Sequence, residues 1–528
     1  MLPDRPTMAE LITRQGHLRG AHPLLVCDAE RLDYAGAERR SAVIARGLIA
    51  LGAGKGTHVG LLYPNGEEFV VAMLAAARIG AVVVPFTTFA TARELGEHLS
   101  DADVAILLAT RAYRSHDYVR RCRETLGLES FDQESFDGTQ PLFTPAAPQL
   151  RHVAFDLEHV ARLAAAVDPA LLSAMEDDVD GSDPLAIVYT SGSTGAPKGA
   201  VHTHSSLLRH QENLNEVRRL TAADRLFCNS PFFWIGGLAF GLFATIVAGS
   251  TLVCSNATDP AETLDLLEAE RPTIANGFTA TVAHLARHDT FARRDLSAMR
   301  RGNLYPIMPA DARPADPELR HNMLGMTEAG STLLISADES DQAEERRGSF
   351  GKPAPGFEIE VADPETQVGV EEGALGELRI RGPHLMQRYH RRSREECFDA
   401  DGWFATGDLV CLDVDGFVYF IGRRGAMIKT AGANVTPAEV EKAVCTVTGG
   451  AVSYVIGIPD PDRGEVVGAA IVVNVGEGFD EDALRAALSS QLSAYKVPRR
   501  IIAVAAADVP LLSSGKVDTR RLRGLFDV

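Results

Sequence analysis

The sequence has little cysteine and fewer basic residues than acidic ones. Its seven cysteines are scattered over 528 residues without a CxxC pair, a spacing that disfavours zinc sites and disulfide frameworks and is typical of reduced thiols. The formal net charge of −19 disfavours a general binder of nucleic acid or of anionic membranes, since both would repel the chain at long range. No nucleic-acid partner is expected, and any phosphate site must be local.

Long uncharged stretches are almost absent as well. The N-terminus, MLPDRPTMAELITRQG, carries charges where an export signal needs an apolar core, so we expect a cytoplasmic protein. One stretch, residues 226–258, has no charged residue and is long enough to be weighed as a membrane span. A proline and four glycines interrupt it, which favours a buried strand, a helix and a second strand over a transmembrane span.

What the sequence does contain is an alternation of short apolar runs with helical patterns. The runs are HVGLLY (58–63), AVVVPF (81–86), VAILLAT (104–110) and LAIVYT (185–190), and the clearest helical pattern is EEFVVAMLAAARIG (67–80). This alternation is typical of parallel sheets covered by helices, so the predicted fold class is α/β. In residues 111–183 the apolar residues recur with neither a helical nor a strand period, so we expect surface structure there. Strand-like runs after residue 348 predict a β-rich subdomain. The C-terminal stretch predicts a small α+β unit.

The strongest local signal is YTSGSTGAPKGA, residues 189–200, directly after an apolar strand. Glycine permits positive φ and close approach, so backbone N–H groups, hydroxyls and one lysine can surround a polyphosphate. The pattern is not a Walker loop, because GxxxxGK[ST] is absent; a flexible surface turn is the alternative. The predicted phosphate-binding residues are Thr190, Ser191, Gly192, Ser193, Thr194, Gly195 and Lys198.

This loop resembles the signature of the adenylate-forming superfamily of acyl-CoA synthetases, luciferases and peptide-synthetase adenylation domains. Five further motifs follow in the family's order: LGMTEAG (324–330), GELRIRGP (376–383), DGWFATGDL (401–409), GRRGAMIKTAGANVTPAEVE (422–441) and LLSSGKVD (511–518). The chain looks most like a fatty or other acyl-CoA synthetase. The resemblance implies a large N-terminal domain, residues 1–425, of two α/β subdomains and a β-rich one. A small, mobile α+β domain, residues 426–528, would follow.

The resemblance also implies an activity. A carboxylic acid, either fatty or bulky and aromatic, is activated with ATP and Mg²⁺ to an acyl-adenylate with release of pyrophosphate, and the acyl group then passes to coenzyme A. Two alternatives stay open: a ligase that delivers to a carrier-protein phosphopantetheine, and a nucleotide sensor without catalysis. A sensor that only binds nucleotide does not need a lysine that stabilises the transition state, which is the role that the resemblance gives to Lys516. The presence of Lys516 together with Thr327 and Glu328 therefore favours an enzyme. A homodimer is left open.

Individual roles follow from the same resemblance. Thr327 matches the family's threonine at the α-phosphate, and Glu328 matches its Mg²⁺ ligand, a hard cation that takes oxygen ligands. Lys516 matches the lysine that stabilises the charge developing on the phosphates, and these three residues are the predicted catalytic set. Asp408 matches the aspartate that binds both ribose hydroxyls, and Arg423 matches an arginine that reaches the nucleotide.

Two further sites are expected for the acid and the thiol. Gly432 and Ala433 match the hairpin that lines the coenzyme A tunnel. The predicted acyl-pocket residues are Phe233, Trp234, Gly237 and Phe278. The aromatic run also includes Phe232, and the alternative for this run is a place in the hydrophobic core. A separate pair, His202 and His204, forms HxH without a third ligand candidate, so packed histidines are preferred over a metal site.

Three positions depart from the family pattern. Leu324, which with Gly325 belongs to the predicted nucleotide site, stands where an aromatic residue usually stacks on adenine. Ala426 occupies the place of the usual hinge aspartate, and RRGNLYPIMP (300–309) replaces a glycine-rich stretch that contacts the base. These departures concern adenine binding and domain rotation and leave the predicted phosphate site unchanged.

Overall fold

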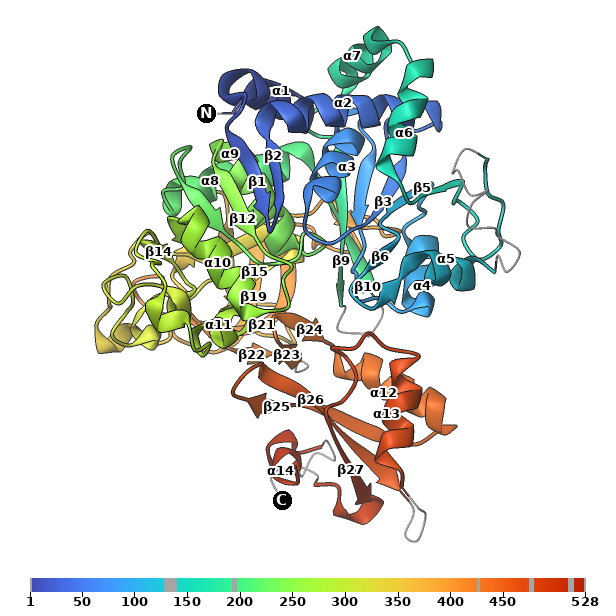
Figure 1. Ribbon diagram of the computed structural model, residues 1–528. Coiled ribbons are helices and arrows are strands. Elements are labelled where there is room, and N and C mark those ends of the chain that lie inside the picture. The colour runs from blue at the N-terminus through green and yellow to red at the C-terminus, as the bar shows by residue number, and fades with distance from the viewer. Residues whose placement is uncertain are drawn as a thin grey trace. The chain divides into compact units, whose positions relative to one another are not determined.

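The computed structural model describes residues 2–127, 140–191, 197–424, 428–473, 479–510 and 517–526 (Figure 1). The chain divides into two compact units. The larger consists of Met1–Thr88, Gly96–Tyr189 and Gly199–Ile421, and the smaller of Phe89–Leu95, Thr190–Lys198 and Gly422–Val528. The predicted boundary between residues 425 and 426 falls outside the described residues and stays a prediction.

Two mainly parallel sheets form the α/β part of the larger unit. The six-stranded sheet has the order β14 (Arg301–Gly302), β13 (Ile274–Ala275), β11 (Arg225–Phe227), β12 (Thr251–Cys254), β1 (Pro23–Cys27), β2 (Glu30–Asp33). The seven-stranded sheet has the order β20 (Arg388–Tyr389), β10 (Pro197–Thr203), β9 (Pro184–Ser191), β4 (Val82–Pro85), β3 (His58–Leu62), β5 (Ile106–Ala109), β8 (His152–Ala154). The four apolar runs identified in the sequence are thus β3, β4, β5 and β9, side by side in one sheet as expected for buried parallel strands.

Helices accompany these sheets (Figure 1). They are α1 (Met8–Arg19), α2 (Tyr34–Ala50), α3 (Glu67–Arg78), α4 (Ala92–Asp101), α5 (Tyr118–Leu126), α6 (Leu157–Leu163), α7 (Pro169–Asp178), α8 (His204–Val217), α9 (Ala244–Ala248), α10 (Pro260–Glu270) and α11 (Ala283–Ala286). Local sequence fixes their starts: Thr7 and Glu10 form a reciprocal capping box at α1, which satisfies N–H groups that the first turn cannot.

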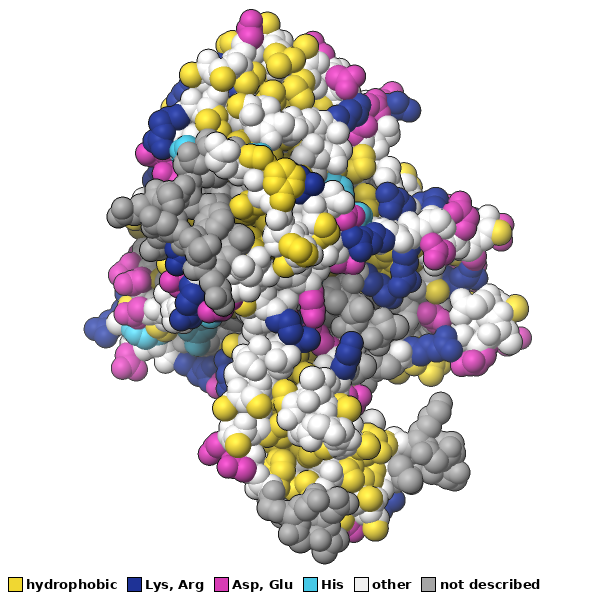
Figure 2. All heavy atoms as spheres, turned by 90° about the vertical axis from the view of Figure 1, so that its right-hand side faces the viewer, with side chains coloured by type: hydrophobic (Ala, Val, Ile, Leu, Met, Phe, Trp, Pro, Cys, Tyr) yellow, Lys and Arg dark blue, Asp and Glu magenta, His cyan; other side chains and the backbone are white. Residues whose placement is uncertain are grey.

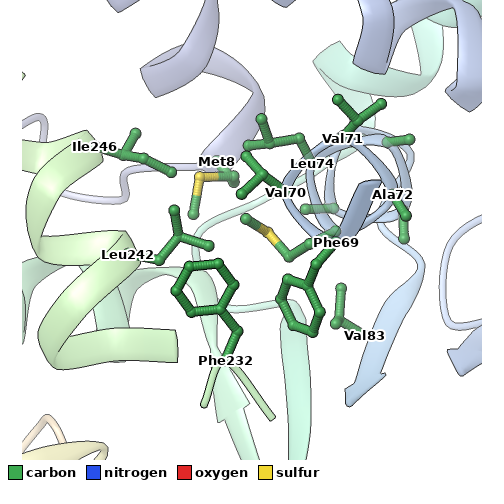
Figure 3. Close-up of a cluster of buried hydrophobic side chains, with 14 of the residues drawn as sticks. Met8, Phe69, Val70, Val71, Ala72, Leu74, Val83, Phe232, Leu242 and Ile246 are labelled. Carbon is green, nitrogen blue, oxygen red and sulfur yellow. The ribbon is translucent and has the colours of Figure 1, made fainter. Parts of the chain in front are cut away.

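The core of the larger unit is built where α1, α3 and the segment after β11 meet (Figure 3). Phe69 of α3 packs on Phe232 with ring centroids 5.4 Å apart, and both side chains are almost fully buried, as is Met8. Burying an aromatic side chain of this size contributes on the order of 2 to 3 kcal/mol. Phe232, one of the four aromatic residues considered for an acyl pocket, is therefore a core residue.

The uncharged stretch at 226–258 folds as the sequence indicates. It contains the end of β11, a π-helix (Gly236–Phe243), α9 and β12. Across the part of the chain that the structure describes, no helix is both long and apolar enough to cross a membrane.

Residues 111–183 hold more regular structure than the sequence indicates. Strand β8 adds to the seven-stranded sheet beside β5, and a small hairpin pairs β6 (Ala112–Tyr113) with β7 (His116–Asp117). A strand of three residues is too short to show a period of two, which is why the pattern did not reveal it.

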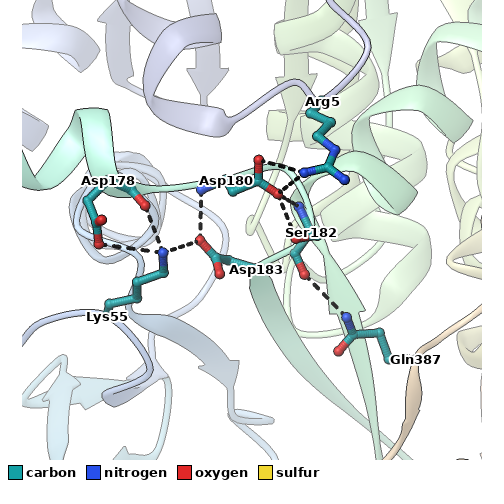
Figure 4. A network of polar contacts seen from close by, with 7 residues as sticks. All are labelled: Arg5, Lys55, Asp178, Asp180, Ser182, Asp183 and Gln387. Carbon is teal, nitrogen blue, oxygen red and sulfur yellow. Dashed lines mark hydrogen bonds and ion pairs between the residues drawn. The ribbon is translucent and has the colours of Figure 1, made fainter.

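Three aspartates before β9, Asp178, Asp180 and Asp183, make polar contacts with basic side chains (Figure 4). Lys55 Nζ lies 2.9 Å from a carboxylate oxygen of Asp183 and donates to the carbonyl of Asp178 at 2.7 Å, while Arg5 approaches Asp180 at 3.3 Å. These contacts are exposed and each contributes little to stability. Elsewhere, Figure 2 shows acidic, basic and hydrophobic side chains interspersed over one face.

A β-rich part completes the larger unit. A three-stranded sheet holds β15 (Leu324–Met326), β16 (Ser331–Ile335) and β17 (Lys352–Pro353), and a four-stranded one holds β18 (Glu358–Ala362), β19 (Gly376–Arg381), β21 (Phe404–Leu412) and β22 (Val418–Arg423). The strand-like runs predicted after residue 348 correspond to β18, β19 and β22 of the four-stranded sheet.

The smaller unit is the predicted α+β unit. Its sheet has the order β24 (Ala433–Val435), β23 (Ile428–Thr430), β26 (Gly464–Val473), β25 (Ser453–Asp460), with β27 (Arg500–Ala505) also paired to β26, and its helices are α12 (Pro437–Thr448), α13 (Glu481–Ser489) and α14 (Thr519–Gly524). Buried Lys496 Nζ lies 3.1 Å from Glu94 and 2.7 Å from Glu439, so an ion-paired cluster joins the Phe89–Leu95 segment to this unit.

Candidate active site

Thr327 and Glu328 occupy a tight turn between two paired strands. β15 and β16 are antiparallel, with Met326 opposite Ser331, and a 3₁₀ turn over Thr327–Ala329 connects them. Gly330 closes the turn at φ +68° and donates its N–H to the Thr327 carbonyl at 2.9 Å. Glycine suits this left-handed position because it has no Cβ to clash. The sequence TEAG therefore holds Thr327 and Glu328 in a defined backbone geometry.

Contacts from β10 and the β20 region fix this turn. Backbone N–H of Met386 donates to the Glu328 carbonyl at 2.8 Å, and His202 Nε2 lies 2.7 Å from the Thr327 carbonyl oxygen. β10 and β20 are themselves paired, with Ala200 opposite Tyr389. The strand that follows the phosphate loop and the turn that carries Glu328 are thus parts of one hydrogen-bonded frame.

His202 is held in one neutral form. Its side chain is fully buried, and desolvation lowers its pKa to about 4, against the opposing effect of the hydrogen bond to Thr327. Because a carbonyl only accepts, Nε2 must carry the proton of the neutral ring. His202 therefore acts as a fixed donor that orients the Thr327 carbonyl.

Glu328 is a buried carboxylate with one oxygen engaged. The residue is 8% exposed, and the phenolic hydroxyl of Tyr389 donates to its Oε1 at 2.6 Å. This leaves Oε2 as an oxygen ligand for a hard cation, which fits Mg²⁺ bound jointly with substrate phosphates. Within the described ranges, no group of three or more His, Cys, Asp or Glu side chains could hold a metal by itself.

Asp408 lies on β21, in the four-stranded sheet. Its side chain is 4% exposed, and its backbone N–H donates to Thr406 Oγ1 at 3.0 Å. The preceding Gly407 has φ +76°, and the ladder with β19 shifts register at this point. A bulge of this kind re-aims the side chains that follow it, so the sequence FATGD places an aspartate at an irregular point of the sheet.

The aromatic residues expected at an acyl pocket behave differently from one another. Phe233 is buried, Trp234 is partly exposed and Phe278 is 40% exposed. The ring of Trp234 stands perpendicular to that of Phe278 at 6.3 Å and lies 5.5 Å from that of Phe233. Trp234 and Phe278 thus form a contacting aromatic pair with surface left uncovered.

Gly237 is required by close packing. A Cβ placed on it would lie 2.1 Å from the carbonyl oxygen of Pro231, so no side chain fits. It is the second residue of the π-helix, an element that is often found at functional sites.

Leu324 and Gly325, the remaining predicted nucleotide contacts of the larger unit, differ in exposure. Leu324 is 6% exposed and belongs to a hydrophobic cluster with Leu334 and Met386, whereas Gly325 is exposed. The adenine role of Leu324 stays a prediction.

The smaller unit carries the other predicted residues. Thr190 and Ser191 end β9, Lys198 lies on β10, and Arg423 ends β22. Gly192, Ser193, Thr194, Gly195, Ala426 and Lys516 lie outside the described residues, so their predicted roles stay predictions.

Gly432 lies in the turn of a hairpin and Ala433 begins its second strand, β24, as the TAGANV pattern predicts. β23 and β24 are antiparallel with Thr430 opposite Ala433, and the two turn residues, Ala431 and Gly432, have φ +47° and +83°. Positive φ at both central positions is the requirement of a type I′ turn. Glycine at 432 is therefore explained by backbone geometry alone, and its role at a thiol tunnel stays a prediction.

The two histidines of the HxH pattern contact separate backbone groups. His202 meets the Thr327 carbonyl, whereas Nδ1 of His204 accepts the N–H of Met8 at 3.1 Å. These contacts agree with the preferred interpretation of packed histidines.

Sequence reasoning missed Tyr389, which bonds Glu328, and Asn276, a buried asparagine directly after β13. Tyr389 reaches Glu328 only because β20 pairs with β10, a long-range contact that no local pattern reports. An available signal for Asn276 was that an asparagine follows each of four strands, β11 to β14.

Comparison with known proteins places these observations in a family. Residues 12–390 match the family described as AMP-binding enzyme, and residues 439–516 match the AMP-binding enzyme C-terminal domain. A feruloyl-CoA synthase of Amycolatopsis sp is 32% identical, with 94% of both chains covered. A 3-[(3aS,4S,7aS)-7a-methyl-1,5-dioxo-octahydro-1H-inden-4-yl]propanoyl:CoA ligase of Mycobacterium tuberculosis is 30% identical, covering 99% of this chain and 100% of its own. The fatty acyl CoA synthetase structure from Mycobacterium tuberculosis aligns with a TM-score of 0.66 at 27% identity over 98% of each chain.

These matches confirm the predicted superfamily and the predicted fold class of a large α/β domain with a β-rich part and a small C-terminal domain. They span almost the whole chain. The three named acids, an aryl, a bicyclic and a fatty one, differ in kind, so membership does not fix the acid.

Proposed function

Because the chain belongs to the AMP-binding enzyme family, among its AMP-forming acid–CoA ligases, we propose that it activates a bulky or aromatic carboxylic acid with ATP and transfers the acyl group to coenzyme A. The observation that carries this proposal is the Glu328 turn, whose carboxylate Tyr389 holds by one oxygen. Such an arrangement leaves an oriented oxygen for a phosphate-bound cation.

The first half-reaction makes an acyl-adenylate. A carboxylate oxygen of the acid attacks the α-phosphorus of ATP, the new O–P bond forms, and the bond to pyrophosphate breaks. Thr327 would bind the α-phosphate through its hydroxyl, and Lys516 would stabilise the charge that gathers on the phosphates. Glu328 would hold Mg²⁺, which when bound neutralises phosphate charge. Residues 190–195 and Lys198 would cradle the phosphates, and Asp408 and Arg423 would bind the ribose and the nucleotide.

The second half-reaction makes the thioester. The thiol of coenzyme A attacks the carbonyl carbon of the acyl-adenylate, the C–S bond forms, and AMP leaves. We assign the β23–β24 hairpin, with Gly432 and Ala433, to the thiol path after movement of the smaller unit. A carrier-protein phosphopantetheine is the competing acceptor, and a cytoplasmic location and a homodimer stay predictions.

The acid is proposed from the aromatic pair. Trp234 and Phe278 offer uncovered ring surface, and apolar ring contact favours a bulky or aromatic acid over a short polar one. The feruloyl-CoA synthase similarity supports an aromatic acid. A fatty acid is the second candidate, favoured by the fatty acyl CoA synthetase similarity.

A panel of carboxylic acids tests the function. Acids are compared by acid-dependent pyrophosphate release with and without coenzyme A, and the products are identified. We expect at least one aromatic acid to give pyrophosphate, AMP and an acyl-CoA. Pyrophosphate exchange without any acyl-CoA would favour a carrier protein, and no acid-dependent turnover with retained nucleotide binding would favour the sensor.

A further inference from the structure

Four adjacent strands of the six-stranded sheet are each followed by an asparagine. Asn229 and Asn256 come two residues after β11 and β12, and Asn276 and Asn303 directly after β13 and β14. The order β14-β13-β11-β12 and their parallel pairing bring the four carboxyl ends to one edge. In open α/β sheets this is the edge at which ligands bind.

Backbone contacts determine which way two of these amides point. The N–H of Gly277 donates to Asn303 Oδ1 at 3.1 Å, and Asn303 Nδ2 donates to the Gly277 carbonyl at 2.8 Å. Since the backbone groups cannot exchange roles, the Asn303 amide has one orientation. The side-chain amide of Asn276 lies 3.2 Å from Asn303 Oδ1. Because Asn303 Oδ1 is an acceptor, the Asn276 atom at this contact must be the donor Nδ2. The other end of the Asn276 amide is consequently an acceptor, Oδ1.

That acceptor is buried without a hydrogen bond. Asn276 is 5% exposed, and its Oδ1 has no partner among the residues that the structure describes. A buried acceptor in this condition costs about 1 to 3 kcal/mol, so native proteins satisfy it with water or a ligand. What satisfies it must be a donor, an O–H or an N–H.

Asn256 lies at the same edge of the sheet, but its side-chain amide already has hydrogen-bond partners, so it serves as the comparison for Asn276. Its Nδ2 donates to the Asn65 carbonyl at 2.6 Å, and the Asn65 side chain bonds both the carbonyl of Ser230 and the N–H of Phe232. These amides join loops of the core. Asn276 differs because part of its amide is unused.

The residues next to Asn276 suit an aromatic ring. Phe278, two residues further on, keeps 40% of its surface exposed and meets the partly exposed Trp234 edge to face. An uncovered aromatic pair close in sequence to a buried acceptor combines apolar ring contact with one polar specificity group, the usual composition of a small-molecule site.

We propose that Asn276 determines acid specificity by accepting, at Oδ1, a hydrogen bond from a hydroxyl group on the ring of an aromatic acid. This inference rests on the proposed function, since it places the acid at this edge of the sheet. It narrows the substrate class from bulky or aromatic acids to hydroxylated aromatic acids. A site built to bond a hydroxyl discriminates strongly against the analogue that lacks it, because its own polar group is then left unpaired.

Matched pairs of acids test the inference by binding, without catalysis. The probes are 4-hydroxycinnamate with cinnamate and the 3- and 4-hydroxybenzoates with benzoate, and the dissociation constants come from quenching of tryptophan fluorescence. We expect the wild-type protein to bind at least one hydroxylated acid roughly tenfold or more tightly than its partner. Asn276→Ala should bring that ratio close to one, whereas Asn256→Ala should preserve it.

The ratio within one variant is the decisive quantity, because a general loss of stability weakens both members of a pair alike. Equal binding of both members by the wild-type protein, or an unchanged ratio in Asn276→Ala, would overturn the inference. Acid-dependent pyrophosphate release is measured separately with the same acids. If no acid releases pyrophosphate but the hydroxylated acid still binds more tightly than its partner, the proposed function is refuted and the role of Asn276 is retained.

Discussion

The hydroxyl of Tyr389 donates to Oε1 of Glu328 at 2.6 Å, between two residues 61 positions apart in the chain. Both side chains are buried, at 7% and 8% exposure. The bond commits one carboxylate oxygen and fixes the direction of the other, which makes Tyr389 a positioning residue for the proposed Mg²⁺ ligand.

Tyr389→Phe should raise the Mg²⁺ concentration needed for half-maximal acid-dependent pyrophosphate release. Phenylalanine keeps the ring and removes only the donor, so Glu328 loses its orientation, and loss of such a supporting partner weakens metal binding roughly tenfold or more. The measurement is a Mg²⁺ titration at saturating ATP and acid.

Tyr419→Phe is the matched control. Tyr419 lies on β22, and its hydroxyl bonds the Glu345 carbonyl and the Asp413 carboxylate instead of Glu328. A normal Mg²⁺ titration in Tyr389→Phe, or the same shift in Tyr419→Phe, would show that the Tyr389 bond does not position the ligand.

Buried histidines should make the larger unit sensitive to acid. Desolvation lowers the pKa of His204 and His384 to about 4 and that of His210 to about 3, against 6.5 in the unfolded chain. The folded state therefore binds fewer protons, and the stability contribution present above pH 6.5 is lost as pH falls toward these folded values. Each histidine reduces the unfolding free energy by up to about 1.4 kcal/mol per pH unit in that window.

His210→Phe measures this contribution. The ring packs against Phe357 and stacks on His384 at 5.3 Å, so an aromatic replacement keeps the contacts and removes one titrating group. Urea unfolding between pH 7 and pH 5 should show a smaller decrease in stability with falling pH for the variant than for the wild type. Equal slopes would mean that His210 is not held neutral.

Substitutions at Gly432 should separate the half-reactions. Gly432→Leu adds a side chain on the proposed thiol path but also strains a residue at φ +83°, by on the order of 1 to 2 kcal/mol. Gly432→Asn adds bulk where asparagine tolerates positive φ. If the hairpin lines the path, both variants keep acid-dependent pyrophosphate exchange and lose acyl-CoA formation. An asparagine variant with normal acyl-CoA formation would indicate that glycine serves the turn only.

Lys516→Ala should lower acyl-adenylate formation by roughly a hundredfold or more, the scale for removing one charge-stabilising donor. Thioester formation from supplied acyl-adenylate should fall much less, and Lys442→Ala, an exposed lysine on α12, should change neither. Equal losses in both half-reactions would remove the assigned role.

Much of the fold could be predicted because local pattern and burial agree. The runs that became β3, β4, β5 and β9 are apolar along their length, as strands covered on both faces must be. The turn at Gly432 was equally visible, since a hairpin with positive φ restricts residue choice. Strand β8 was missed because three residues carry no period.

The parts of the site that escaped prediction depend on contacts between distant segments. Tyr389 is one aromatic residue in a polar stretch until β20 pairs with β10 and brings it to Glu328. Phe232 and Trp234 lie in the same aromatic run, yet one packs on Phe69 in the core and the other stays partly exposed against Phe278. The orientation of the Asn276 amide depends on Asn303, whose own amide is oriented by the backbone of Gly277.

The most direct test of the central claim, that the Thr327–Glu328 turn serves acid activation, is the Mg²⁺ dependence of acid-dependent pyrophosphate exchange in Glu328→Gln. Glutamine keeps the size of the side chain and removes the negative charge that a hard cation needs. The account predicts a half-saturating Mg²⁺ concentration at least about tenfold higher than in the wild type, with no change in Glu318→Gln, an exposed glutamate of the same unit. A Glu328→Gln titration that superimposes on the wild-type curve would contradict it.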